Sequence, residues 1–121
     1  MALIMNVREF DGVTAVSMEG QIVLGEESSA FREKMEALLM ADKKRIVLNV
    51  ADVTYIDSVG VGALLTSFNS ARSHGATVKL ANLGSRFREI LQVTRLLTVF
   101  DSYQTEAAAI QSFAKARQHH A

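Results

Sequence analysis

The chain of 121 residues carries 13 basic and 13 acidic side chains, so its formal net charge is zero. This balance argues against non-specific binding to nucleic acid or anionic membranes, because both need a surplus of lysine and arginine. The absence of cysteine excludes disulfides, thiol nucleophiles and zinc–thiolate sites. No apolar run approaches the roughly 18 residues of a membrane span, and the first residues lack a signal-peptide pattern. We therefore expect one cytoplasmic domain over 1–121, without direct membrane insertion.

The first forty residues predict a hairpin followed by a helix. Residues 3–10 and 13–18 have strand patterns, and Asp11-Gly12 between them is a strong hairpin turn. Residues 21–24 either extend the second strand or form a short third one. Four apolar side chains then share one helical face, with Ser28 or Ser29 as the expected cap. The four are Phe31, Met35, Leu38 and Leu39.

Strands and helices alternate in the rest of the chain. Residues 46–50 form a β-branched run, typical of a strand buried on both faces, and residues 53–56 continue it. A long helix from Ser58 to His74 follows, closed by Gly75. We then expect a strand at 77–83, a helix capped by Ser85, a strand at 97–100 and a helix over 105–117. This order predicts an α/β fold with a mixed sheet of about four to six strands and about four to five helices packed on it.

The junction at Asp57-Ser58 is the most informative segment of the sequence. A buried strand ends there and a helix begins, and ligands or partners usually meet an α/β sheet at this end of a strand. Ser58 is expected beside the unpaired N–H groups and the positive end of the helix dipole. Gly60 and Gly62 each cost the helix roughly 1 kcal/mol relative to alanine, which calls for a compensating reason.

Two interpretations of this junction stay open on the residues alone. Serine and aspartate are good helix caps, and glycines permit tight packing of a helix on a sheet. Alternatively, Ser58 is a phosphorylation site, where a phosphate would meet helix N–H groups and add about 1.5–2 negative charges beside Asp57. A partner docked on this surface would then face repulsion and a new desolvation cost.

The sequence resembles the STAS domain, the fold of bacterial anti-sigma factor antagonists. The resemblance is carried by residues 46–50, 52–65, 75–83 and 87–96, and most specifically by Asp57-Ser58-Val59-Gly60. It implies a protein without catalysis or a cofactor of its own, which binds an anti-sigma factor when unphosphorylated and so releases a sigma factor. It also implies that the partner is often a serine-protein kinase that phosphorylates Ser58, and that a PP2C-type phosphatase reverses the modification.

The resemblance also implies a partner-binding surface, and two positions depart from the family pattern. Val23 stands where many antagonists carry the aspartate of Gly-x-Leu-Asp, and Arg95 stands where glycine is common. Both leave open a partner other than the standard kinase, and also a scaffold or subunit of a stress-signalling or lipid-transport complex. The residues expected on the surface are Val23, Glu26, Asp57, Ser58, Val59, Gly60, Val61 and Gly62.

An enzyme with Ser58 as its nucleophile is the least favoured class. The Gly-x-Ser-x-Gly pattern is broken at Ile56, and His74 lies roughly 24 Å along the helix, too far for proton transfer. The other histidines, His119 and His120, are adjacent and near the end of the sequence, and we expect no metal site there. An exposed early strand could pair with another chain, so a homodimer is a further expectation.

Overall fold

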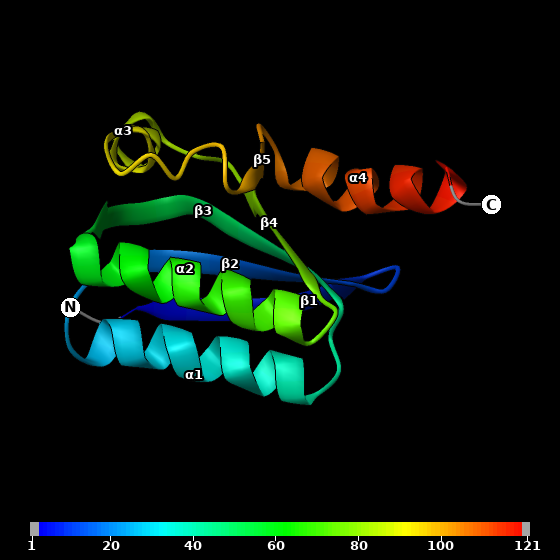
Figure 1. The fold of residues 1–121 in the computed structure, drawn as a ribbon, viewed down its shortest axis with the longest axis horizontal. Helices are drawn as coiled ribbons and strands as arrows, with labels where there is room; N and C mark the ends of the chain where they lie inside the picture. Colours follow the sequence, from blue (N-terminus) through cyan, green and yellow to red (C-terminus); the bar gives the residue numbers. More distant parts are fainter. Residues whose placement is uncertain (1–2, 120–121) are drawn as a thin grey trace.

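The computed structural model describes residues 3–119, with side chains through Ala114 (Figure 1). Within this range the chain forms the predicted α/β fold, a five-stranded mixed sheet with four helices. The elements are β1 (Ile4–Phe10), β2 (Val13–Ile22), α1 (Glu26–Met40), β3 (Arg45–Ile56), α2 (Ser58–Ser73), β4 (Thr77–Ala81), α3 (Ser85–Val93), β5 (Asp101–Tyr103) and α4 (Glu106–His119).

The strands lie in the sheet in the same order as in the sequence, β1-β2-β3-β4-β5. β1 and β2 are antiparallel and the three other pairings are parallel. The predicted turn between β1 and β2 is confirmed, because Asp11 and Gly12 both have positive φ, 51° and 82°. That geometry matches the twist of a two-residue hairpin.

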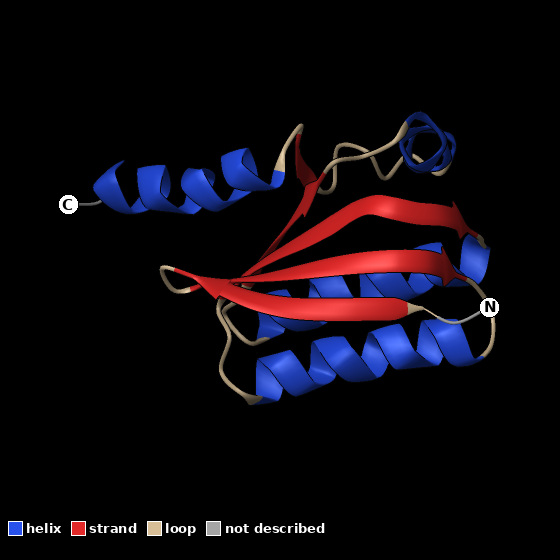
Figure 2. Ribbon diagram, turned by 180° about the vertical axis from the view of Figure 1, so that it is seen from behind, coloured by secondary structure: helices blue, strands red, loops and turns tan. Residues whose placement is uncertain are grey.

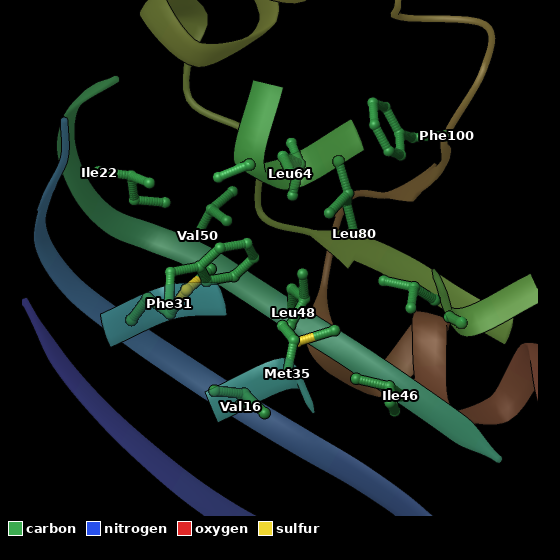
Figure 3. Close-up of a cluster of buried hydrophobic side chains, with 14 of the residues drawn as sticks. Val16, Ile22, Phe31, Met35, Ile46, Leu48, Val50, Leu64, Leu80 and Phe100 are labelled. Atoms are coloured by element: carbon green, nitrogen blue, oxygen red, sulfur yellow. The ribbon is translucent and has the colours of Figure 1, made fainter. Parts of the chain in front are cut away.

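Two helical layers cover the sheet. α1 and α2 lie side by side on one face, and α4 packs against the other (Figures 1 and 2). The larger core lies between the sheet and α1 and α2, and includes Phe31, Leu48 and Leu64 (Figure 3). The alternation along β3 explains the two layers, since Leu48 faces the larger core while Val47 packs against Phe113 and its neighbours beneath α4.

Polar contacts hold α4 to the sheet. Glu106, at the start of α4, lies 2.7 Å from a guanidinium nitrogen of Arg8 in β1, and accepts a 2.9 Å hydrogen bond from Asn49 in β3. Lys79 is buried in β4 and donates a 2.7 Å hydrogen bond to the Ser112 hydroxyl. These contacts connect α4 to three different strands.

Two predicted helix caps are wrong. α1 begins at Glu26 after Gly25, whose φ of 112° is open to glycine, and Ser28 lies inside the first turn with its hydroxyl donating to the Gly25 carbonyl. Likewise, Ser85 is the first residue of α3 and Gly84 precedes the helix without a side-chain cap. Both helices begin directly after a glycine, so each helix starts earlier in the sequence than a serine cap would place it.

The last strand also differs from the prediction. β5 is Asp101–Tyr103, whereas we expected a strand over residues 97–100. Phe100 is instead buried in the larger core, and its ring meets Phe68 edge-on with a 5.1 Å centroid distance. The apolar run therefore packs into the core as an irregular segment, and the pairing with β4 begins just after it.

Candidate functional site

Asp57 caps α2 and connects it to the loop between β2 and α1. Its backbone is extended, and its Oδ1 accepts a 2.8 Å hydrogen bond from the Gly60 amide. Its Oδ2 accepts a 3.0 Å hydrogen bond from the Leu24 amide, 33 residues earlier in the sequence. One carboxylate oxygen therefore binds the first turn of α2, and the other binds the loop between β2 and α1.

The charge of Asp57 is stabilised by these bonds. The hydrogen bond from the Leu24 amide lowers the pKa of the Asp57 carboxyl below its usual value, and the Gly60 amide adds to this effect. The small burial of the group acts in the opposite direction and does not outweigh the amides. The site therefore carries a fixed negative charge at neutral pH.

Ser58 occupies the first position of α2 and is exposed. The side chain that caps α2 is that of Asp57, so Ser58 has no capping role. The Ser58 hydroxyl lies on the surface next to a carboxylate and at the positive end of a helix of 16 residues.

The two glycines of α2 have different surroundings. A Cβ on Gly60 would lie 2.0 Å from the Ile22 carbonyl oxygen, so Gly60 allows the helix to approach the end of β2. A Cβ on Gly62 would meet nothing within 4 Å, so packing does not explain this glycine. Gly62 is partly exposed and follows Ser58 by four positions, on the same face of the helix.

The other expected surface residues divide between surface and core. Glu26 is exposed, and Val23 and Val59 are half-buried near the same end of the sheet. Val61 is buried in the larger core, so its side chain does not belong to the exposed surface. The sequence interpretation missed Leu24, which is 71% exposed and whose amide is held by Asp57.

The remaining candidates lie elsewhere. Arg95 follows α3 with a φ of 60°, the left-handed conformation that explains why glycine is common at this position. His74 follows the last residue of α2, at the opposite end from Ser58. Among the side chains that the structure describes, through Ala114, no group of three or more histidines, aspartates or glutamates is placed to bind a metal ion. His120 lies outside the described residues, as does the side chain of His119.

Residues 5–109 match the STAS domain family. The chain belongs to this family. It is 27% identical over 112 residues to the anti-sigma-B factor antagonist of Bacillus subtilis, a match that covers 92% of this chain and 100% of the relative. None of the helices in the described part of this STAS domain has the length and apolar character needed to cross a bilayer.

Solved structures share the fold of this STAS domain. An anti-sigma factor antagonist from Mycobacterium paratuberculosis superposes with a TM-score of 0.78 at 21% identity, covering 91% of this chain and 92% of that one. The phosphorylated form of the Bacillus cell fate determinant SpoIIAA superposes with a TM-score of 0.70 at 18% identity, covering 91% and 99%. At these identities the likeness establishes the fold.

Proposed function

We propose that this chain is a phosphorylation-controlled anti-sigma factor antagonist. In its unphosphorylated form it binds an anti-sigma factor of the serine-protein kinase type through the surface around Asp57, Ser58 and Gly62, and so releases a sigma factor. Phosphorylation of Ser58 by the kinase ends the binding, and a PP2C-type phosphatase restores it. The observation that carries the proposal is the exposed Ser58 hydroxyl, which the cap at Asp57 leaves available.

Electrostatics supports a switch at this position. A phosphate on Ser58 would add about 1.5–2 negative charges beside a carboxylate that is already charged. The N-terminus of α2 compensates part of this charge, so the domain stays folded while the surface seen by a partner changes. The effect is therefore a loss of binding rather than a loss of structure.

The surface around Ser58 also has the features of a docking site. Leu24 presents an exposed apolar side chain, and Gly62 leaves the exposed face of α2 without a side chain. A partner backbone can approach closely at such a glycine. Partner binding would therefore explain why residue 62 is glycine, which packing within the fold does not explain. An anti-sigma factor acts on sigma factors, so we place the complex in the cytoplasm.

Binding assays with three variants test this proposal. Wild-type protein, Ser58→Ala and Ser58→Asp serve as baits in extracts of the source cells, and captured proteins are identified by mass spectrometry. Ser85→Asp is the matched control, because Ser85 is also exposed at the first position of a helix. We expect wild type, Ser58→Ala and Ser85→Asp to capture an ATP-binding anti-sigma factor, and Ser58→Asp to lose it.

The opposite result would favour the scaffold alternative. If all four baits capture the same assembly equally, Ser58 is not a switch and the protein is a constitutive subunit. Phosphorylation of the wild-type chain but not Ser58→Ala by the captured kinase, with ATP, would separately establish the modified residue.

A further inference from the structure

β1 forms one open edge of the sheet. It pairs with β2 on one side, and within residues 3–119 no strand pairs with its other side (Figure 2). Such an edge presents a row of backbone N–H and C=O groups that can bond to another strand. Its seven residues extend over roughly 24 Å, at about 3.4 Å per residue.

The exposed apolar side chains of β1 are arranged symmetrically. Ile4 is 50% exposed, and Val7 and Phe10 are each 40% exposed. Ile4 and Phe10 each lie three positions from Val7, so the pattern is the same when it is read in either direction. Because successive side chains of a strand alternate, Ile4 and Phe10 share one face of the sheet and Val7 lies on the other.

We infer that β1 is a homodimer interface, in which the β1 strands of two copies pair antiparallel about a two-fold axis at Val7. Val7 then lies opposite Val7 of the second copy, and Ile4 lies opposite Phe10. Each exposed apolar side chain of β1 gains an apolar partner directly across the ladder, where side chains interact most strongly. The pairing joins the two five-stranded sheets into one.

Charge favours this register over its neighbours. With the axis at Val7, Arg8 lies opposite Asn6 of the second copy and Glu9 lies opposite Met5. An axis at Arg8 or at Glu9 would place like charges directly opposite each other, and an axis at Asn6 would place Ile4 opposite Arg8. The Arg8 charge is also compensated within its own copy by Glu106, 2.7 Å away.

The expected dimer is weak. One added strand pairing buries less surface than the roughly 1,200 Å² of a stable protein interface, so dimerisation should depend on protein concentration. The inference does not depend on the proposed function, since Ser58 and Gly62 lie on α2 and not on the β1 edge.

Sedimentation equilibrium over a range of concentrations tests the interface. Val7→Lys places two positive charges opposite each other, and we expect it to raise the dimer dissociation constant at least about tenfold. Val93→Lys is the matched control, because Val93 is 76% exposed on α3 and lies off the edge. Unfolding curves of both variants show whether they remain folded.

Cysteine cross-linking tests the register, since the wild-type chain has no cysteine. Val7→Cys brings two sulfurs together at the axis, within reach of a disulfide. Glu9→Cys places them four positions apart along the ladder, roughly 13 Å, which is too far. We expect a covalent dimer from Val7→Cys and none from Glu9→Cys.

Three results would overturn the inference. The first is that the chain stays monomeric at its highest soluble concentration. Binding of a strand from a different protein at the β1 edge would not rescue the inference in that case. The second is a dimer that Val93→Lys weakens as much as Val7→Lys does. The third is a dimer in which Glu9→Cys cross-links as readily as Val7→Cys.

Discussion

The starts of α2 and α3 carry the same residue in the same place but have different surroundings. Ser58 and Ser85 are each exposed at the first position of a helix. α2 is capped by the Asp57 carboxylate, which also bonds to the Leu24 amide, whereas α3 follows Gly84 without a side-chain cap. The two serines therefore differ in their neighbours. Ser58 lies near a charged carboxylate, a loop bonded to that carboxylate and a glycine with open space around it, and these surroundings are the reason that we propose the switch at Ser58.

The largest expected effect is on the packing of the start of α2. Gly60→Ala places a Cβ 2.0 Å from the Ile22 carbonyl oxygen, and backbone must move to relieve the clash. We expect a loss of about 2–3 kcal/mol of unfolding free energy, measured by urea denaturation. Gly84→Ala is the control at the start of α3, where a Cβ meets nothing within 4 Å. Equal stabilities for the two variants would show that the close approach of α2 to β2 is unimportant.

A smaller loss is expected when the α2 cap is removed. Asp57→Ala deletes both amide hydrogen bonds and should cost about 1 kcal/mol of unfolding free energy. Ser58→Ala leaves the cap intact and should change the unfolding free energy by less than about 0.5 kcal/mol. The same urea measurements check both variants. A larger loss of unfolding free energy for Ser58→Ala than for Asp57→Ala would contradict the identification of Asp57 as the cap.

Gly62→Ala should stabilise the free domain and weaken partner binding. The helix gains up to about 1 kcal/mol from alanine, because the added methyl group meets only open space. If the partner backbone approaches α2 at this position, the same methyl group reduces capture of the anti-sigma factor. Thermal unfolding and quantitative pull-down measure the two effects, and a stabilised variant with undiminished binding would remove Gly62 from the docking surface.

The smallest effect is a pH dependence specific to α2. Because the pKa of Asp57 is lowered in the folded state, its charge stabilises the fold above the usual carboxyl range. That contribution is lost as the pH falls below about 4, through the folded pKa. Asp57→Asn keeps a capping oxygen without the charge, so the stability difference between wild type and this variant should shrink between pH 7 and pH 3. A difference that stays constant over this range would mean that the charge contributes nothing.

The sequence predicted the regular parts of this fold because their signals are local. The hairpin at Asp11-Gly12, the buried strand at 46–50 and the start of α2 at Ser58 are confirmed, since turn chemistry and apolar periodicity determine them. The caps at Ser28 and Ser85 are wrong because serine was preferred over the glycines that precede both helices.

The candidate site was predicted only in part, because its geometry depends on distant segments. The hydrogen bond from Leu24 to Asp57 joins residues 33 positions apart, and neither residue reveals the other in the sequence. Nor does the sequence distinguish Gly60 from Gly62. The two differ because the end of β2 lies against Gly60, whereas Gly62 has open space around it. The local signal that could have indicated Leu24 is a leucine at the end of an apolar run and directly before a glycine, Gly25.

The order of the strands has a consequence for synthesis of the chain. Each strand pairs with the strand made just before it, so a growing chain can add strands to the sheet one at a time as it leaves the ribosome. No strand has to wait for a partner that has not yet been translated. Among the described strands β1 is the first to be made, and no later strand in residues 3–119 covers its outer side.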